Sequence, residues 1–424
     1  MSKHLPSRSS VGWLLVFTLL AIAILTNVAR IVQGQTTQTQ TNAPQTPQQR
    51  PRRVGTPTDQ TLPAKPSPNA NADGRSAPVE VGDDEVLRVD TQLVPVPVVV
   101  RDKAGRPVAN LRAENFTLYE DGRPQRIANF TTTDAPFEIA LVLDTSGSTR
   151  EDIGLIRRAA NLFIDALRPG DRVAIVSFNT KLEGKSSLAT VEVKSPLTDD
   201  RQMLRDALDK IGSSNGTPYY DALERVATEV FREPPRAEVK GRRALVALTD
   251  GVDSTSDAEF DEARARLRQS GIISYFIQVN TEDFVEDRLL RDCQDDGRLS
   301  LSKVQLQRYR RIYASSADAA DYANFCQMGS FERMDISRKL YQLARGEMQT
   351  LARDTGGKTF NALDLRDARR AFSEVAEEIG KLYSLGYYPT NKTRDGSFRT
   401  IHVEVRGVPG AQITAREGYQ APKG

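Results

Sequence analysis

A succession of short apolar runs and amphipathic patterns between residues 135 and 382 limits the possible folds more than any other feature of this chain. In the first run, Glu138–Leu143, all residues but the first are apolar. Uninterrupted runs of this kind are typical of strands buried on both faces of a sheet. A helical pattern follows, ends near Gly170, and gives way to the apolar run 173–176. The alternation predicts an α/β fold with a doubly wound, mostly parallel sheet.

Oxygen-bearing side chains follow the first predicted strand directly. Asp144, Ser146 and Ser148 place one carboxylate and two hydroxyl groups in a five-residue loop that opens a helix. All three are hard oxygen ligands, which suit Mg²⁺ or Mn²⁺ better than Zn²⁺. Asp and Ser are also common caps of helix N-termini, so this loop alone leaves both interpretations open.

Two further loops carry side chains of the same kind. A Gly/Ser/Asn-rich loop at 212–218 contains Thr217 just before a helical pattern. The apolar run 244–248 is a second predicted buried strand, and it leads through a threonine to Asp250. If the two strands are parallel neighbours in one sheet, Asp144 and Asp250 lie at the same edge, where ligands bind in open α/β sheets.

Together these three loops resemble the metal-ion-dependent adhesion site, or MIDAS, of von Willebrand factor A (VWA) domains. That pattern is Asp-x-Ser-x-Ser, a distant Thr and a distant Asp after a strand, and it is matched here by Asp144, Ser146, Ser148, Thr217 and Asp250. The resemblance implies a Rossmann-like VWA domain over 135–382 and an Mg²⁺ or Mn²⁺ ion. It also implies that the serines ligate the ion directly, that the carboxylates act mainly through water, and that a partner's Asp or Glu completes the coordination.

An enzyme is not expected. The loop after Asp144 has Ser146 where haloacid-dehalogenase-type phosphatases have a second carboxylate, and no nucleotide-binding or nucleophile-elbow motif is present. The histidines are only His4 and His402, so a Ser-His-Asp triad is not expected. Two alternatives to a binding module remain: a structural envelope-assembly protein with an unused metal site, and a metal-dependent hydrolase.

The N-terminal part of the chain differs from the rest. Residues 11–29 are uncharged and mostly apolar, so residues 1–34 are expected to be a membrane anchor or a signal peptide. Residues 35–82 are rich in Gln, Thr and Pro and predict a disordered tether. Either reading of residues 1–34 places the bulk of the chain outside the cytoplasm. The net charge of +2 gives no indication of nucleic-acid binding.

Strand patterns flank the α/β region on both sides. We expect residues 83–134 and 383–420 to form one discontinuous β-sandwich into which the VWA domain is inserted. Within it, Pro95 and Pro97 predict an edge strand, because proline cannot donate a ladder hydrogen bond. The order of segments also resembles a group of VWA-related proteins of acidobacterial type, marked by Val-Pro-Val, Tyr-Glu-Asp-Gly and Leu-Gly-Tyr-Tyr-Pro.

Residues 281–336 depart from the expected VWA core. They are rich in Asp, Arg, Gln and Ser and contain both cysteines of the chain, Cys293 and Cys326. We interpret them as a surface insertion, either a partner contact or a loop expansion without a function. Outside the cytoplasm, a Cys293–Cys326 disulfide is expected if the two residues lie close together.

Overall fold

The computed structural model describes residues 93–132, 134–146, 153–183, 186–236, 238–239, 242–291, 301–322 and 325–424. These residues belong to one compact unit, Glu85–Gly424. The expected anchor at 1–34 and tether at 35–82 lie outside them. No helix in the described ranges is both long and apolar enough to cross a membrane.

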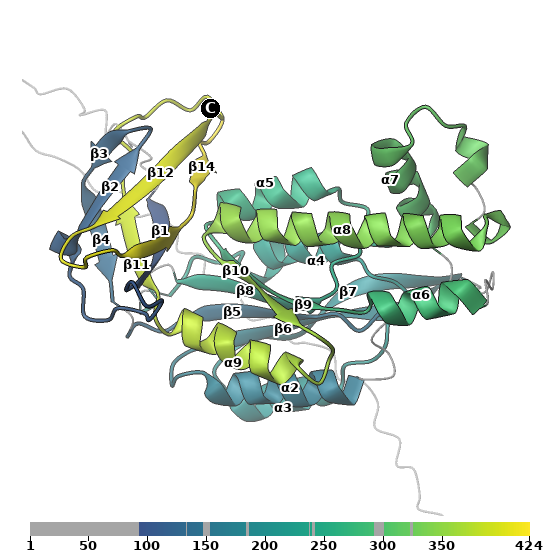
Figure 1. Ribbon diagram of the computed structural model, residues 1–424. Helices are drawn as coiled ribbons and strands as arrows, with labels where there is room; N and C mark the ends of the chain where they lie inside the picture. Colours follow the sequence, from purple (N-terminus) through teal and green to yellow (C-terminus); the bar gives the residue numbers. More distant parts are fainter. Residues whose placement is uncertain are drawn as a thin grey trace, which may run out of the picture. The chain divides into compact units, whose positions relative to one another are not determined.

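The α/β region is built on a six-stranded sheet with the order β10-β9-β8-β5-β6-β7 (Figure 1). All neighbours in it are parallel except β6 and β7, so the expected mostly parallel sheet is confirmed. The sheet strands are β5 (Glu138–Leu143), β6 (Arg172–Glu183), β7 (Ser186–Thr198), β8 (Arg243–Thr249), β9 (Ile273–Val279) and β10 (Lys358–Ala362).

Helices cover both faces of this sheet (Figure 1). One face packs on α2 (Ile153–Ala166), α3 (Arg201–Asp209) and α9 (Ala368–Ile379). The other packs on α4 (Tyr219–Arg225), α5 (Phe260–Ser270) and α8 (Ser330–Thr355). Strand β5 shows why both faces are covered, because its side chains alternate between two apolar cores. Ile139 and Leu141 enter one core, while Ala140 and Val142 enter the other. Every residue of β5 is buried, as its apolar run predicts.

Two elements differ from their predicted extents. Strand β6 continues to Glu183 and forms a long antiparallel hairpin with β7, although only 173–176 has the apolar pattern of a buried strand. The tip of this hairpin extends past the core, where Leu182 is 78 % exposed, so no apolar pattern marks it. Helix α8 begins at Ser330, whereas its pattern predicts a start near residue 337, and it therefore includes the end of the predicted insertion.

Strands from both ends of the described chain pair in two further antiparallel sheets. Their orders are β13-β1-β11-β4 and β14-β12-β2-β3, and residues of both contribute to one apolar core. The strands are β1 (Val94–Arg101), β2 (Phe116–Glu120), β3 (Arg123–Gln125), β4 (Ile127–Thr131), β11 (Tyr383–Tyr387), β12 (Phe398–Val405), β13 (Gln412–Ala415) and β14 (Gly418–Gln420).

The prediction of an edge strand at Pro95 and Pro97 is wrong for β1 as a whole, which lies between β13 and β11. The two neighbours cover different halves of the strand. β11 pairs with Val94–Val98, and β13 pairs only from Val98 onward. At both prolines a ladder partner is therefore present on one side only, which is the position that proline tolerates.

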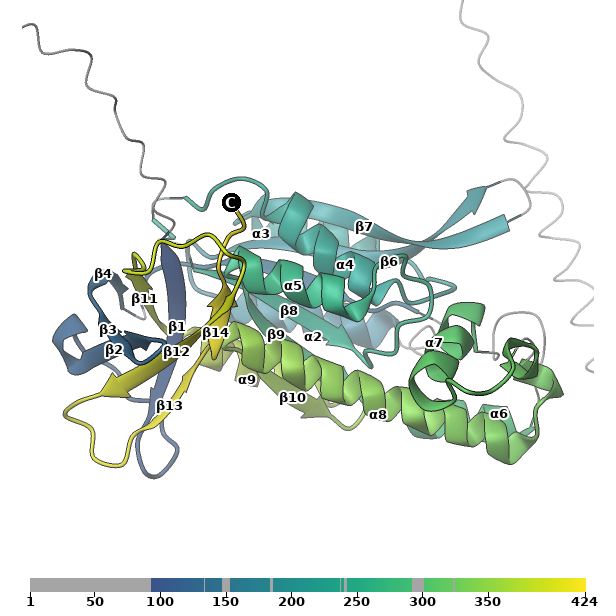
Figure 2. The same ribbon diagram turned by 90° about the horizontal axis from the view of Figure 1, so that it is seen from above.

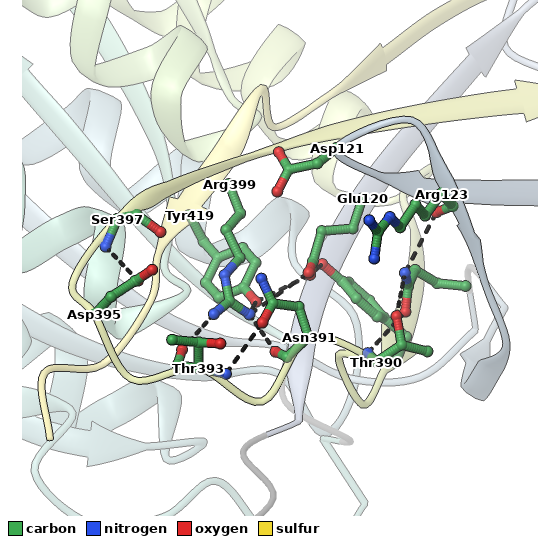
Figure 3. Close-up of polar contacts among 12 residues, drawn as sticks. Glu120, Asp121, Arg123, Thr390, Asn391, Thr393, Asp395, Ser397, Arg399 and Tyr419 are labelled. Atoms are coloured by element: carbon green, nitrogen blue, oxygen red, sulfur yellow. Dashed lines mark hydrogen bonds and ion pairs between the residues drawn. The ribbon is translucent and has the colours of Figure 1, made fainter.

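A buried polar network joins these two sheets (Figure 3). Glu120 and Arg399 are each 2 % exposed, and their charged atoms lie 3.5 Å apart. The hydroxyl groups of Tyr387 and Tyr419 donate to the Glu120 carboxylate at 2.6 and 3.0 Å. Arg399 also donates to the main-chain oxygen of Asn391, so the network holds the loop after β11 against the core.

Candidate functional site

Asp144 and Asp250 follow two adjacent parallel strands, β5 and β8. The register pairs Leu143 with Leu248, and the amide of Asp144 donates to the oxygen of Leu248 at 3.0 Å. Both carboxylates are deeply buried, with Asp144 1 % and Asp250 4 % exposed. The structure therefore brings the two predicted acids to the same edge of the sheet.

The loop at 212–218 joins this edge through main-chain hydrogen bonds. The amide of Ser214 donates to the oxygen of Thr145 at 2.7 Å, which ties this loop to the one after β5. Thr217 is linked to the loop after β8, since its amide donates to Ser254 Oγ at 2.8 Å and its oxygen accepts from the Ser254 amide at 3.0 Å. Three loops far apart in sequence thus meet around Asp144, Thr217 and Asp250.

Neutral donors fix the direction of both carboxylates. Asp144 accepts from the amide of Ser146 at 2.9 Å and from Thr249 Oγ1 at 2.7 Å. Asp250 accepts from Thr281 Oγ1 at 2.6 Å, and this hydroxyl also lies 2.8 Å from the hydroxyl of Tyr341 on α8. Thr249, Thr281 and Tyr341 therefore orient the acids, as outer-shell groups do around metal sites.

Gly251 allows helix α8 to approach this loop. Its φ of +77° is in the left-handed region, and a Cβ there would lie 2.8 Å from Met348 Cε on α8. A side chain at this position would therefore be strained and would collide with the core. The glycine of the Thr249-Asp250-Gly251 sequence is therefore required by the backbone conformation and by the packing of α8, independently of any ligand.

The electrostatics of the site favour a cation. Burial, and next the neighbouring Asp250 charge, raise the pKa of Asp144 to about 7. Two buried acids side by side cost free energy unless a proton or a cation compensates them. No group of three or more His, Cys, Asp or Glu side chains among the described residues is placed to hold a metal ion. Any ion here would therefore use hydroxyl groups together with the two carboxylates, a set of hard oxygen donors that fits Mg²⁺ or Mn²⁺.

Four of the five predicted site residues are described, and they converge: Asp144, Ser146, Thr217 and Asp250 are all buried at this edge. Ser148 lies outside the described residues, and its role stays a prediction.

The sequence analysis missed Asp253, a third buried acid in the loop after β8. Its Oδ1 accepts from the amide of Tyr219 at 2.9 Å and from the hydroxyl of Ser256, so it caps the start of α4. Burial raises its pKa to about 6. The cap comes from a residue 34 positions away in sequence, which no local N-cap pattern can reveal.

The region 281–336 contacts the loop that carries Asp250. It contains α6 (Glu282–Arg291) and α7 (Lys303–Tyr313), and it packs a small core of its own onto α8 and Val252. Ser302 Oγ, at the start of α7, donates to the oxygen of Ser254 at 2.6 Å. The insertion is therefore attached to the site edge. Cys326 is disulfide-bonded, and its expected partner Cys293 lies outside the described residues, so their pairing stays a prediction.

Residues 138–305 match the family model of the von Willebrand factor type A domain. The matched region, which is a mixed sheet flanked by helices, is therefore similar to a von Willebrand factor type A domain. Domains of this type are commonly metal-dependent protein-interaction modules and are generally not enzymes. No curated protein sequence matches the chain. The resemblance to the acidobacterial group stays a prediction.

Solved structures that are similar to part of this chain are distant from it. One is proximal thread matrix protein 1 from the mussel byssus, with 15 % identity over 65 % of this chain and a TM-score of 0.36. The similarity spans 51 %, about half, of the mussel chain. A von Willebrand factor type A protein from Catenulispora acidiphila is 11 % identical, with 79 % of this chain and 75 % of that chain covered and a TM-score of 0.37. Values this low carry no information about partners.

Proposed function

We propose that this protein is a metal-dependent binding module that recognises a carboxylate of a partner protein. Asp144, Ser146, Ser148, Thr217 and Asp250 hold an Mg²⁺ or Mn²⁺ ion at the edge of the sheet. The observation that carries the proposal is the convergence of two buried carboxylates and the Thr217 loop at the ends of β5 and β8. An Asp or Glu side chain of the partner completes the coordination of the ion.

The chemistry of the donors supports this role. Hydroxyl groups of Ser146, Ser148 and Thr217 are neutral, so an ion held by them keeps most of its charge for an anionic partner. Asp144 and Asp250 supply compensating charge and are held in place by Thr249 and Thr281. The bound ion supplies the electrostatic attraction, and the chain positions the donors and excludes competing water by burial.

The domain arrangement fits a module that works outside the cytoplasm. We infer that residues 1–34 anchor or export the chain and that residues 35–82 tether it. Residues 83–134 and 383–420 form a discontinuous β-sandwich that presents the VWA domain at 135–382. In this arrangement the hydrophobic segment within residues 1–34 would hold the chain at the membrane. Residues 35–82 would then be a spacer between the membrane and the metal site.

A thermal melt of the purified full chain tests the metal site directly. The melting temperature is compared in EDTA, Mg²⁺ and Mn²⁺ for the native sequence, for Asp144→Ala and for Asp199→Ala, an exposed control. Because a ligand that binds only the folded state stabilises it by mass action, we expect a metal-dependent rise in the native and control proteins alone.

Partner binding requires a second readout. Immobilised protein is offered a synthetic peptide containing one Glu and the same peptide with Gln, with and without Mg²⁺. Retention of the Glu peptide only with the metal supports the proposal. Equal retention in EDTA would contradict it and favour a structural protein whose metal site is not used. Turnover of a phosphoester that Asp144→Ala abolishes would instead favour a hydrolase.

A further inference from the structure

A cationic cavity lies away from the metal edge, where the ends of β1, β11 and β14 meet α5. Its volume is about 810 Å³, within the usual range of small-molecule sites. Figures 1 and 2 show β14 beside α5, and the last residues of α5, Arg268 to Ser270, line the cavity. Five of its lining side chains are basic and none is acidic: Arg236, Arg243, Arg268, Arg416 and Lys423.

Arg416 is the most deeply buried of these cations, at 3 % exposure. Its guanidinium donates to the main-chain oxygens of Gly418 at 2.8 Å, Arg268 at 2.9 Å and Pro95 at 3.3 Å. Among the described residues, no carboxylate lies within ion-pair distance of it. Burial lowers the pKa of Arg416 to about 10, because its charge is poorly compensated.

Arg268 provides a second cation with spare hydrogen-bonding capacity. Its guanidinium carbon lies 4.0 Å from the centre of the Phe398 ring, and its closest carboxylate contact, to Asp354, is long at 3.9 Å. Within the described parts of the chain its buried Nε has no hydrogen-bond partner. Burial lowers the pKa of Arg268 as well. An anion bound beside its guanidinium would compensate a charge that the distant Asp354 compensates only in part.

The carboxylates next to these cations are already engaged elsewhere. Asp354 pairs with Arg264 at 2.6 Å, and Glu417 pairs with Arg353 at 3.2 Å. Of the lining cations, only Arg243 has a close ion pair to a carboxylate in the described ranges, to Glu138 at 2.9 Å. The cavity therefore keeps a net positive charge in the described structure.

The remaining lining suits an organic ligand rather than a bare ion. Leu93 and Pro95 are half-buried apolar residues of the wall, and Leu93 packs over Gly386, which also lines the cavity. Arg236 and Lys423 are exposed at the rim, where they can attract an anion from solution.

We propose that this cavity binds an organic anion that carries a carboxylate or phosphate group beside an apolar part. The oxyanion contacts Arg268, with Arg416 and the rim cations adding attraction, and the apolar part lies against Leu93 and Pro95. Guanidinium groups match both oxyanions geometrically, so the head group is left to the experiment. The occupied cavity links α5 of the VWA domain to strands at both ends of the described chain.

Isothermal titration calorimetry of the purified full chain, stripped of divalent ions and then dialysed free of chelator, at low ionic strength, tests the proposal. Phenyl phosphate and benzoate share a ring and differ in head group, and benzyl alcohol is the neutral control. Because no divalent ion is present, the probe cannot bind through the proposed metal site, and Asp144→Ala is expected to bind the probes like the native protein. We expect one-site binding of at least one anion and none of benzyl alcohol.

Three variants identify the location. Arg268→Gln is expected to weaken binding by roughly 10-fold or more, the usual effect of losing a charge-assisted hydrogen bond. The double variant Arg236→Gln/Lys423→Gln changes only exposed rim residues, so it keeps the test decisive if Arg268→Gln fails to fold. It is expected to weaken binding by about 3-fold. Arg406→Gln changes an exposed residue just after the end of β12, is the matched control and is expected to bind normally.

Two results would overturn the proposal. One is the absence of saturable binding by both anions to the native protein. The other is native affinity in the rim double variant together with native affinity in any folded Arg268→Gln protein. Binding of phenyl phosphate alone, or of benzoate alone, supports the proposal and assigns the head group.

Discussion

The two ends of strand β5 each have a buried carboxylate, yet the first is paired with arginines and the second lies beside another acid. Glu138 begins the strand, is 1 % exposed, and forms ion pairs with Arg172 at 2.7 Å and Arg243 at 2.9 Å. Asp144 follows the strand, is equally buried, and lies against a second acid, Asp250. Its hydrogen bonds from Ser146 and Thr249 come from neutral donors.

The comparison separates a structural carboxylate from a ligand-binding one. Two arginines compensate the charge of Glu138 in the folded protein, so this carboxylate needs no bound cation. The described donors to Asp144 are neutral, and Asp250 adds to the unfavourable energy of its charge. The carboxylate at the start of β5 therefore stabilises the folded protein. The carboxylate after its end lowers the free energy of unfolding unless a cation binds.

Glu138→Ala is expected to lower the free energy of unfolding by about 3–5 kcal/mol. Removing the carboxylate leaves Arg172 and Arg243 as buried charges with no compensating partner there, which is the costly way to break a buried ion pair. Urea denaturation measures the loss, and the response to Mg²⁺ is expected to persist in the folded fraction. A loss below about 1 kcal/mol would mean that the pair behaves as an exposed one.

Asp144→Asn is expected to have the opposite sign in EDTA. Because the substitution removes one of two adjacent buried acids, the metal-free protein should unfold at the same urea concentration or a higher one. In Mg²⁺ at about 100 times the dissociation constant, the native protein should gain about 2.7 kcal/mol that the variant lacks. Destabilisation in EDTA comparable to that of Glu138→Ala would contradict the proposed contrast between the two ends of β5.

The sequence predicted the meeting of Asp144 and Asp250 for a simple reason. Both residues directly follow buried strands, and parallel neighbours end at the same edge of a sheet. The residues that orient them were not predictable in the same way. Thr281 is 31 positions from Asp250 in sequence, and its contact depends on how β9 and α8 pack.

The fold shows the same limit. Alternating apolar runs predicted β5 and β8 well, because burial on both faces leaves a clear pattern. The hairpin of β6 and β7 extends beyond the core and leaves no such pattern. The prolines of β1 indicated an edge that exists only along half of the strand. Hydrophobic patterns in the sequence indicate burial. They do not predict strand pairing that extends beyond the core, as in the β6–β7 hairpin, or a strand whose neighbours change along its length, as in β1.

Asp253→Asn should change how stability depends on pH. Burial raises the pKa of Asp253 to about 6, so the folded state holds its proton more tightly than the unfolded chain. The free energy of unfolding contributed by this group is therefore greatest below about pH 4 and falls as the pH rises to about 6, by about 3 kcal/mol. Asparagine can still cap α4 and cannot titrate.

Melts of the native protein and the variant in EDTA, between pH 4 and pH 7, measure this slope. The variant should lose part of the decline across that range. Parallel profiles would show that Asp253 is compensated by its neighbours, among them the hydroxyl of Ser256 and the more distant charge of Arg308. Asp253 would then belong with Glu138 as a structural carboxylate.

Thr217→Val is expected to have the smallest effect on folding and a selective effect on the metal. Both main-chain bonds between Thr217 and Ser254 survive the substitution, so the loop keeps its place and only the hydroxyl is lost. Loss of one neutral donor should weaken Mg²⁺ affinity by roughly 10-fold, equivalent to about 1.4 kcal/mol. Thr217→Ser keeps the hydroxyl and should retain most of the affinity. Calorimetric titration with Mg²⁺ distinguishes the two variants. Native affinity in Thr217→Val with weakening in Thr217→Ser would assign the effect to packing of the methyl group rather than to a ligand, because valine keeps that methyl group and lacks the hydroxyl. The contrast between the two ends of β5 would then rest on the carboxylates alone.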